Sequence, residues 1–256
     1  MTGVGSSEAA DPFVFQPTMC SNYTPVTRRD RMLAFFGVAR ERDDPSADVF
    51  PLGSAPFIRL AEPGSANKVV SEGAFGLLPH FAKELAFGRR TYNARTETVA
   101  TLPSFRDAWR RAQRCIVPAE AIFEPCWETG RAVRWRIGQQ GAVPFGIAGI
   151  YAKWRHAEGF DLFTFAMLTV NADGHPVFQR MHRPGEEKRM VVILDPADHD
   201  HWLACSVADA PKYFKQWTGE LLAEPAPLVR APRATSGKVV RPPTPPAPDT
   251  GDLFQV

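Results

Sequence analysis

The stretch from Cys115 to Val170 decides the fold class; it reads CIVPAEAIFEPCWETGRAVRWRIGQQGAVPFGIAGIYAKWRHAEGFDLFTFAMLTV. Short apolar or alternating runs follow one another in it, separated by Gly, Pro and charged turns, and this pattern is typical of β-strands. Residues Val133–Ile137 alternate apolar and basic side chains, as a half-buried strand does. The predicted strands are Cys115–Val117, Ala121–Trp127, Val133–Ile137, Phe145–Trp154, Phe160–Val170 and, further on, Met190–Leu194.

Helices and further strands flank this β-rich stretch. Thr27, with Asp30 three residues later, resembles a capping box and predicts a helix through Val38. Ser104 is a typical cap for a second helix. The other predicted elements are strands at Ala55–Leu60 and Lys68–Phe75, the capped helix at Phe105–Gln113, and helical pieces at about Pro196–Cys205 and Ala208–Trp217. The sequence therefore predicts an α+β fold with a dominant, curled sheet and short flanking helices.

Composition divides the chain into three parts. Residues 1–18 are small, polar and unpatterned, and we expect them to lie outside the fold as a leader. Residues 19–219 are expected to form one domain. In residues 220–256, 8 of the 24 prolines fall between Pro225 and Pro248. Such a segment cannot bury enough apolar surface to offset its ordering entropy, which predicts a disordered tail.

The overall composition is that of a soluble globular protein. The chain has 256 residues, of which 44% are apolar and 23% charged, and its net charge is +2. No run approaches the roughly 18 apolar residues of a membrane span, and Met1–Ala10 lacks the basic and apolar parts of a secretory signal. We therefore expect a cytoplasmic protein without a membrane partner.

The cysteine and histidine spacing does not favour a metal site. The four cysteines are Cys20, Cys115, Cys126 and Cys205. They form no C-x-x-C pair, and without a secretion signal they should stay reduced. The nearest ligand pair is His199-x-His201, but Asp195-Pro196 just before it is typical of the start of a helix, which predicts exposed helix histidines. No metal or other cofactor is expected.

Arginines cluster in the middle of the chain despite the low net charge. They are Arg89, Arg90, Arg106, Arg110, Arg111 and Arg114. A solvated helix face explains such clustering as well as a local phosphate track does, in which a few contacts matter more than total charge. Both interpretations stay open on clustering alone.

Four short motifs suggest chemistry, although each alone has an ordinary structural explanation. They are Met19-Cys20-Ser21-Asn22-Tyr23, Asn93-Ala94-Arg95-Thr96-Glu97-Thr98, Cys115-Ile116-Val117-Pro118 leading to Phe123-Glu124, and Met181-His182-Arg183-Pro184. Together, and in this order, they resemble the SOS-response-associated peptidase family, also called abasic-site processing proteins. The resemblance runs from Cys20 to about Trp202, and its specific parts are Asn93–Thr98 and Arg114–Glu124. It implies a single β-rich domain with a barrel-like mixed sheet.

The chain departs from the family pattern in several places. Ser21-Asn22-Tyr23 replaces Gly-Arg-Phe, so that a phosphate-binding arginine beside the cysteine is lost. Phenylalanines stand where the loop at Phe75–Phe81 usually has two tryptophans, and Pro125 stands where tryptophan is common. Arg183–Lys188 is a small insertion after His182. These departures affect how the protein would bind DNA.

The resemblance implies that the protein senses abasic sites in single-stranded DNA and joins them to Cys20 as a thiazolidine. Only a cysteine with a free α-amino group can close that ring. By the same resemblance Glu124 and His182 transfer protons, and Asn93 orients the aminothiol. The expected DNA contacts are Arg95, the loop residues Phe75, Leu78 and Pro79, Thr169, and the clustered arginines Arg89 and Arg106.

As written, Cys20 has an ordinary amide nitrogen, so the chain must be processed before this chemistry. Either translation starts at Met19, which is then removed, or the preceding residues are cleaved autocatalytically with Cys20 as the nucleophile. We favour the first route because Met19 matches the family's usual first residue.

Two other functions fit the same residues. A cysteine N-terminal-nucleophile amidohydrolase or peptidase would also need a freed Cys20, but would act on a small amide. A noncatalytic single-strand-binding module would keep Cys20 blocked. The Asn93–Thr98 motif and the clustered arginines favour DNA, and we expect a monomer.

The C-terminal residues suggest a further partner. Asp252-Leu253-Phe254 resembles the end of peptides that dock on bacterial sliding clamps, with Thr250 in place of their leading glutamine. A frayed terminus is the ordinary explanation, and a sliding clamp is the alternative.

Overall fold

The structure, a computed structural model, describes residues 21–228. The strands in this part are β1 (Asn22–Pro25), β2 (Ser54–Leu60), β3 (Lys68–Phe75), β4 (Asn93–Arg95), β5 (Arg114–Cys126), β6 (Val133–Gly138), β7 (Phe145–Arg155), β8 (Asp161–Asn171), β9 (Arg189–Val191), β10 (Ile193–Leu194) and β11 (Leu222–Pro225). The α-helices are α1 (Arg29–Phe36), α2 (Arg106–Arg110) and α3 (His199–Ala204). Short 3-10 turns lie at Leu85–Arg90, Gln140–Ala142, Phe178–Arg180, Pro196–Asp198 and Ala210–Tyr213.

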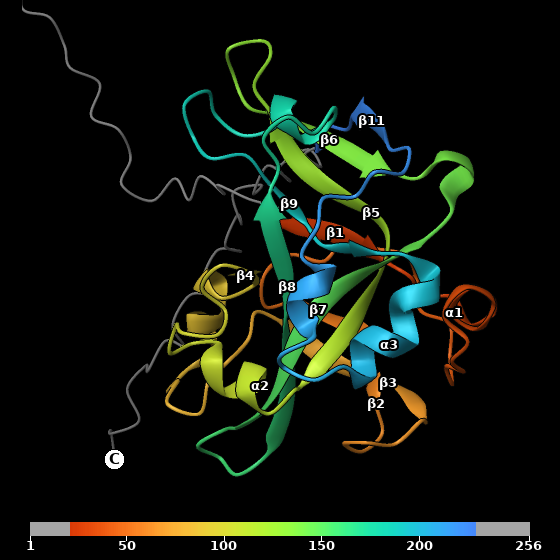
Figure 1. The fold of residues 1–256 in the computed structure, drawn as a ribbon, viewed down its shortest axis with the longest axis vertical. Coiled ribbons are helices and arrows are strands. Elements are labelled where there is room, and N and C mark those ends of the chain that lie inside the picture. Colours follow the sequence, from red (N-terminus) through yellow and green to blue (C-terminus); the bar gives the residue numbers. More distant parts are fainter. Residues whose placement is uncertain (1–20, 229–256) are drawn as a thin grey trace, which may run out of the picture.

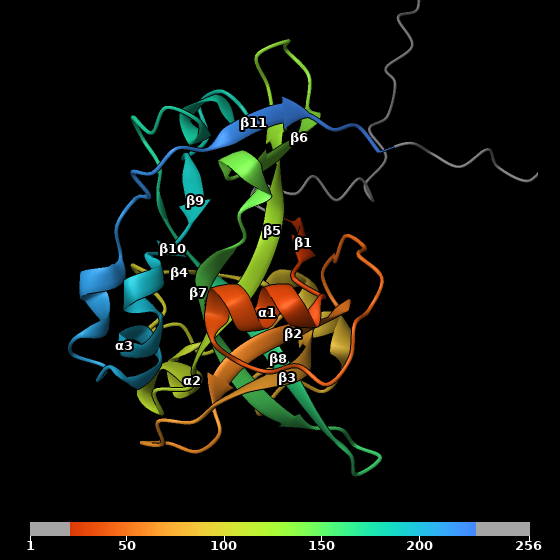
Figure 2. The same ribbon diagram turned by 90° about the vertical axis from the view of Figure 1, so that its right-hand side faces the viewer.

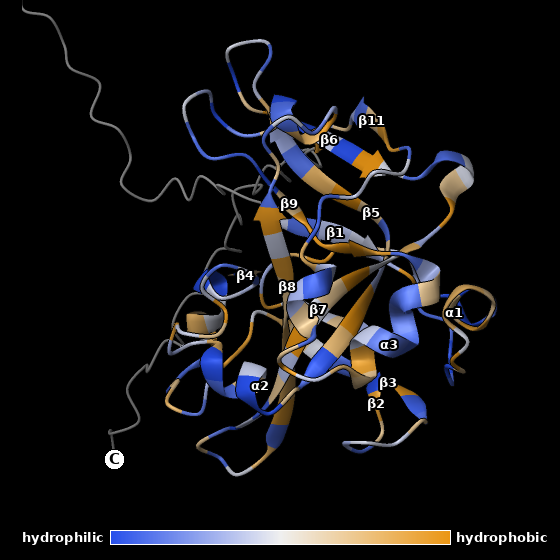
Figure 3. Cartoon of the chain, in the orientation of Figure 1, coloured by the Kyte–Doolittle hydropathy of each residue, from blue (hydrophilic) through white to orange (hydrophobic). Residues whose placement is uncertain are grey.

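Five strands close into a barrel. β5 pairs with β7, β7 with β8, β8 with β3, β3 with β2, and β2 returns to β5. The β3–β8 pairing is parallel and the other pairings of the ring are antiparallel. The expected α+β fold with a barrel-like mixed sheet is confirmed, and Figures 1 and 2 show the short helices around its outside. In Figure 3 strands β7 and β8 are largely hydrophobic, whereas the peripheral loops are hydrophilic.

The long strand β5 joins the barrel to the strands outside it. Its residues Arg114–Ala119 pair with β7, and Ile122–Cys126 pair with β6, while β1 pairs along its other edge. The sequence predicted two strands separated at Pro118, because proline cannot donate to a ladder. The strand instead continues through Pro118, whose carbonyl accepts a hydrogen bond from the Val26 N–H at 3.0 Å. Proline is tolerated here because it lies near the point where the partner changes from β7 to β6.

The helices are shorter than predicted, and neither predicted side-chain cap forms. Helix α1 begins after Arg28 rather than after Thr27, and Asp43 from a later loop accepts the Arg29 N–H at 2.7 Å. Helix α2 begins after Phe105, with no side-chain cap from Ser104. The chain before it is already turned, since the Phe105 N–H donates to the Leu102 carbonyl at 3.0 Å.

One of the clustered arginines belongs to the core rather than to a phosphate track. Arg114 is 2% exposed and lies between Trp109 and Trp202, with its guanidinium carbon 4.5 and 5.1 Å from their ring centroids. Stacking on two indole faces stabilises the buried cation. Its Nη2 donates to the Ser206 carbonyl at 3.1 Å, so that Arg114 fixes α2 and α3 against β5.

His199 is also buried, against the expectation of an exposed helix histidine. It is 6% exposed and stacks on Phe36 with 5.3 Å between ring centroids. The backbone of Gly146 lies so close that an added Cβ would be 2.6 Å from His199 Nε2. Burial lowers the pKa of the His199 imidazole to about 4.

This depressed pKa predicts acid sensitivity of the fold. The unfolded imidazole has a pKa of about 6.5. The contribution of the neutral, buried His199 to the free energy of unfolding is therefore complete above about pH 6.5. It is lost as the pH falls toward the folded pKa of about 4. Between pH 7 and pH 4.5 the wild type should lose roughly 2–3 kcal/mol more unfolding free energy than His199→Gln, measured by urea denaturation. Parallel pH profiles for the two proteins would contradict this assignment.

Ordered structure continues slightly beyond the predicted end of the domain at Gly219. Strand β11 lies in the segment assigned to the tail, and it pairs with β6 from Leu222 to Pro225. β-branched and aromatic residues are scarce in LAEP, which explains why composition gave no strand signal here. Within residues 21–228 no helix is long and apolar enough to cross a membrane.

Candidate active site and nucleic-acid interface

A carboxylate and an imidazole meet inside the protein beside strand β5. Glu124 Oε2 lies 3.8 Å from His182 Nε2, and the two side chains are 1% and 0% exposed. Glu124 lies in the second half of β5, where its register partner is Trp135 of β6. A carboxyl group and an imidazole at this distance, shielded from bulk water, can act together on one proton. The structure thus brings together two of the predicted site residues.

The backbone around His182 holds its ring in place. The φ angle of His182 is 64°, in the left-handed region that non-glycine residues seldom adopt. Its N–H donates to the Pro125 carbonyl at 2.8 Å, and a bridge between Cys126 and Met181 joins the same two segments. Ring atom Nε2 lies 3.1 Å from the Arg189 carbonyl oxygen. Residues kept in this region by their surroundings occur preferentially at functional sites.

Strand β1 runs alongside this buried pair. Its first residue, Asn22, is the register partner of Phe123, which directly precedes Glu124. Asn22 and Tyr23 are both buried, and Tyr23 packs edge-on against Phe75 with 5.3 Å between ring centroids. Cys20 lies outside the described residues, two positions before β1 begins.

The Asn93–Thr98 motif is positioned by its register with β8. Strand β4 pairs in parallel, with Asn93 opposite Met167 and Arg95 opposite Thr169. Side chains alternate along a strand, so Asn93 and Arg95 share one face while Ala94 points into the core. Asn93 is buried, whereas half of the Arg95 side chain is exposed.

Arg189 connects this motif to the strand that follows His182. Its guanidinium is 2% exposed and pairs with Glu97 at 2.8 Å and with Glu187 at 2.5 Å. Burial opposes ionisation of Glu97, but the hydrogen bonds and charge of Arg189, together with bonds from the Glu97 backbone and Thr96, lower the pKa of that carboxyl. The carboxylate partners of the buried cation offset the cost of its desolvation, so Arg189 can connect β8 and β9 with the segment that follows β4.

The structure places Thr169 inside this network and not on the surface. Thr169 is 1% exposed, its hydroxyl accepts from Arg189 Nε at 3.3 Å, and its carbonyl accepts from Arg189 Nη2 at 2.7 Å. Thr169 thus helps to hold Arg189, and its expected contact with DNA stays a prediction.

Three residues of the expected stacking loop are buried as well, and their contact with DNA stays a prediction. Phe75 is fully buried and stacks on Phe165 with 5.5 Å between ring centroids. Leu78 and Pro79 are buried as well. Phe75 ends β3 with its side chain pointing into the barrel, a direction that the loop pattern alone does not reveal. Phe81 is the exposed aromatic residue of this loop, with 44% of its surface accessible.

The other expected DNA contacts lie on the surface. Arg89 is exposed in the turn at Leu85–Arg90, and Arg106 is exposed on α2. Figure 1 shows α2 on the same side of the barrel as β4, the strand that carries Arg95. An ion pair of 3.1 Å between His80 Nδ1 and Asp107 joins the Phe81 loop to α2. Arg89, Arg95, Arg106 and Phe81 thus have exposed side chains, whereas Glu124 and His182 are buried.

Sequence reasoning missed two residues of this region, Arg189 and Glu187. Arg189 lies just before the strand predicted at Met190–Leu194 and was assigned no role, whereas in the structure it is the first residue of β9. Glu187 was noticed only as part of the insertion Arg183–Lys188. Neither spacing nor composition shows that Arg189 would be buried between carboxylates from two separate segments.

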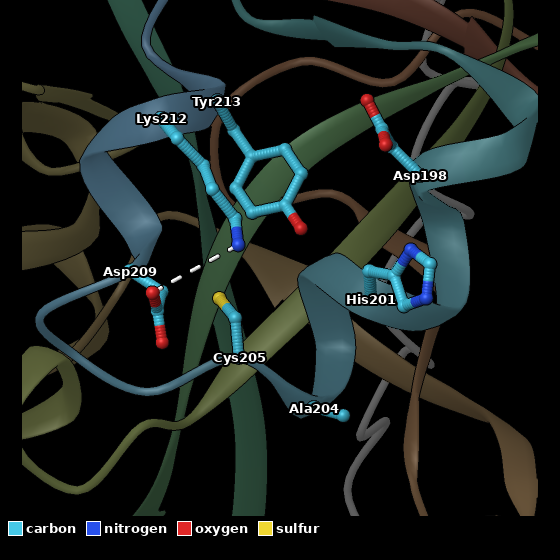
Figure 4. Close-up of a pocket in the computed structure, with 7 residues that line it drawn as sticks. All are labelled: Asp198, His201, Ala204, Cys205, Asp209, Lys212 and Tyr213. Atoms are coloured by element: carbon cyan, nitrogen blue, oxygen red, sulfur yellow. Dashed lines mark ion pairs between the residues drawn. The ribbon is translucent and has the colours of Figure 1, made fainter.

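A separate pocket of roughly 600 Å³ lies beside α3 (Figure 4). It is lined by Asp198, His201, Ala204, Cys205, Asp209, Lys212 and Tyr213. Among these lining side chains, the Lys212 ammonium lies 3.9 Å from Asp209 Oδ1. It includes none of the predicted site residues. Among residues 21–228 no group of three or more His, Cys, Asp or Glu side chains is arranged to hold a metal ion.

The fold and these residues define a class of protein: a closed mixed barrel that holds a carboxylate–imidazole pair beside an arginine-bearing surface. The sequence profile of a family described as SOS response associated peptidase (SRAP) matches residues 19–226. The chain belongs to the SOS response-associated peptidase family.

Relatives and solved structures agree with this family. The chain is 30% identical to the abasic site processing protein YobE of Bacillus subtilis, over 77% of this chain and 87% of that protein. It is 29% identical to YoqW of the same organism, also called an abasic site processing protein, over 77% and 85%. A crystal structure of a Bordetella bronchiseptica protein matches with a TM-score of 0.74 and 36% identity, over 82% of this chain and all of that one. A Bacteroides thetaiotaomicron protein shares the fold at a TM-score of 0.67 and 23% identity.

Proposed function

We propose that this protein processes abasic sites in single-stranded DNA by joining them covalently to Cys20, once that residue has become the N-terminus. The observation that carries the proposal is the buried Glu124–His182 pair, 3.8 Å apart, beside the strand that begins two residues after Cys20. The family and the names of its relatives support abasic DNA as the substrate.

The chemistry starts from the aldehyde of the ring-opened deoxyribose. The α-amine of Cys20 adds to the carbonyl carbon, and loss of one water molecule gives an imine. The thiol then adds to the imine carbon and closes a thiazolidine, with its proton moving to the nitrogen. An α-amino group has a pKa of about 8, against about 10.4 for lysine, so a larger fraction is neutral and nucleophilic at pH 7.

Proton transfer in these steps is assigned to Glu124 and His182. Opening of the sugar ring requires a proton on the ring oxygen, and loss of water from the carbinolamine requires another. A carboxyl group and an imidazole that are buried together suit both transfers. The backbone geometry of His182 and the Arg189 carbonyl hold the imidazole ring in place, which keeps it next to the Glu124 carboxyl group. Asn93 lies on the same face of β4 as Arg95 and is assigned to orient the aminothiol.

Arg95 is assigned to a DNA phosphate next to the abasic site. Arg95→Ala should weaken binding to intact single strands of any sequence about equally. It should also reduce the slope of log affinity against log salt by about 0.7, the value expected for one phosphate contact on a single strand. Arg42→Ala is the matched control, because Arg42 is an exposed arginine on the loop after α1. An unchanged salt slope with altered base preference would contradict a phosphate contact.

The predicted docking of Asp252–Phe254 on a sliding clamp falls on residues outside the described part of the chain, and it stays a prediction. The assignment of residues 1–18 to a leader also falls outside the described residues and stays a prediction. The proposed chemistry needs only that residue 20 carry a free amine, which the mass of the purified protein reports directly.

A further inference from the structure

The guanidinium of Arg95 already has a carboxylate partner in this structure. Arg95 Nη1 lies 2.9 Å from Glu187 Oε2, with the two side chains 50% and 39% exposed. The pair is therefore accessible to solvent and to a competing anion. Pairs of this kind are weak, so a phosphate that approaches Arg95 can replace the carboxylate.

Glu187 is held in position even without Arg95. Its second carboxylate oxygen, Oε1, bonds to Nη1 of the buried Arg189 at 2.5 Å. The two oxygens of one carboxylate thus connect an exposed arginine to a buried one. The strand register explains why Arg95 and Arg189 lie close together. Arg95 and Val191 both pair with Thr169, from opposite edges of β8. Arg189 lies two residues before Val191 and therefore points to the same face of the sheet.

The loop that carries Glu187 is fastened at both ends. This insertion loop, residues 183–188, closes on itself through Lys188. The Lys188 ammonium donates to the carbonyls of Met181, His182 and Arg183 at 2.8, 3.1 and 3.1 Å. Arg183 lies over the Trp127 ring with its guanidinium carbon 4.9 Å from the centroid. The loop therefore presents Glu187 from a defined position, next to the segment that holds His182.

We propose that Glu187 is a built-in counter-anion of Arg95, which a DNA phosphate must displace, and that it sets the affinity and anion selectivity of this subsite. The inference rests on the proposed function, in which Arg95 binds a phosphate. A single small anion gains little by replacing a carboxylate that Arg189 keeps nearby. A DNA strand that is also held at other arginines makes the exchange favourable, because its second contact is intramolecular.

Displacement has a defined structural consequence. When the phosphate takes Arg95, Glu187 stays bonded to Arg189, whose carbonyl contacts the His182 ring at 3.1 Å. The released carboxylate remains near the phosphate and opposes it by like-charge repulsion. Glu187 therefore lowers the affinity for DNA, and its removal should raise it.

The test compares Glu187→Gln with Glu186→Gln in binding to intact single-stranded DNA at low and moderate salt. Both variants remove one negative charge from the insertion loop. Glu186 is exposed and has no ion pair among residues 21–228, so it reports the effect of net charge alone. Glu187→Gln should bind about two- to tenfold more tightly than Glu186→Gln, because it loses both the competing pair and the repulsion. The carbonyl of the new amide can still accept a bond from Arg189, which preserves the fold.

A double-mutant cycle assigns the gain to Arg95. In the Arg95→Ala background, Glu187→Gln should lose most of its advantage over Glu186→Gln, since no guanidinium is left to be released and only the repulsion between Glu187 and DNA remains. One outcome separates the two proposals: wild type binds single strands and Arg95→Ala binds them more weakly, but Glu187→Gln binds no more tightly than Glu186→Gln. That outcome overturns the counter-anion role of Glu187 and leaves the proposed function standing. A gain of undiminished size in the Arg95→Ala background would overturn the counter-anion role as well. Failure of every variant to bind single strands would overturn the proposed function, and this inference with it.

Discussion

Cys20→Ala should abolish the covalent adduct with abasic single-stranded DNA, the largest effect expected of any single substitution in this chain. Ring closure needs the thiol, and an alanine at the N-terminus can form only a reversible imine. The imine does not survive denaturation, so no shifted band should remain on a denaturing gel. Cys20→Ser should leave at most a labile oxazolidine-like species, because an alcohol is a poorer nucleophile than a thiol.

Cys205→Ala is the matched control for this substitution. Cys205 lies beside α3 in the separate pocket of Figure 4, away from Glu124 and His182. The variant should form the adduct at the wild-type rate. The buried Cys115 serves less well, because burial raises the pKa of its thiol and its removal would leave a cavity in the core. A stable adduct of undiminished yield from Cys20→Ala would overturn the mechanism.

Glu124→Gln should slow adduct formation by about 10²–10⁴-fold while binding to intact single strands is retained, because general acid–base groups contribute on that scale. The amide keeps the size of the carboxyl group in its buried place but cannot transfer a proton. Single-turnover formation of the adduct, followed on denaturing gels, measures the rate, and fluorescence anisotropy measures the binding. Glu128→Gln is the control, since Glu128 is an exposed carboxylate on the same hairpin, paired with Arg180.

His182→Asn should slow both formation and reversal of the crosslink. Asparagine is chosen because it tolerates the left-handed backbone angle of 64° better than alanine does. The reason for the effect is the loss of the imidazole to which we assign proton transfer, and which lies 3.8 Å from the Glu124 carboxyl group. If both variants lost DNA binding in proportion to their loss of rate, the pair would be structural rather than catalytic.

Most of the sheet could be predicted from local pattern, and the exceptions share a cause. The strands at residues 133–138 and 145–155 were predicted within one residue, because alternation and bounding turns are local signals. Strands β1, β4 and β11 are three or four residues long, and they exist only because a longer neighbour pairs with them. The continuity of β5 through Pro118 depends in the same way on a change of partner.

The burial of the candidate site residues could not be predicted from the sequence. The resemblance pointed to Asn93, Glu124 and His182; all three are buried, and Glu124 and His182 lie 3.8 Å apart. It also pointed to Phe75 and Thr169 as surface contacts, although the barrel turns both side chains inward. A motif records the type of a residue at a position, whereas exposure depends on the strands that lie across it. The Glu187–Arg95 pair was invisible for the same reason, since it joins segments 92 positions apart.

The most direct test is the intact mass of the product formed from the purified protein and a single-stranded oligonucleotide that carries one abasic site. The account predicts a covalent species whose mass equals the chain from Cys20 plus the oligonucleotide, less one water molecule. Peptide mapping should place the attachment on residue 20, and the same oligonucleotide without the abasic site should give no adduct. An adduct on a lysine, a product from intact DNA, or the absence of any covalent species from a chain that begins at Cys20 would contradict it.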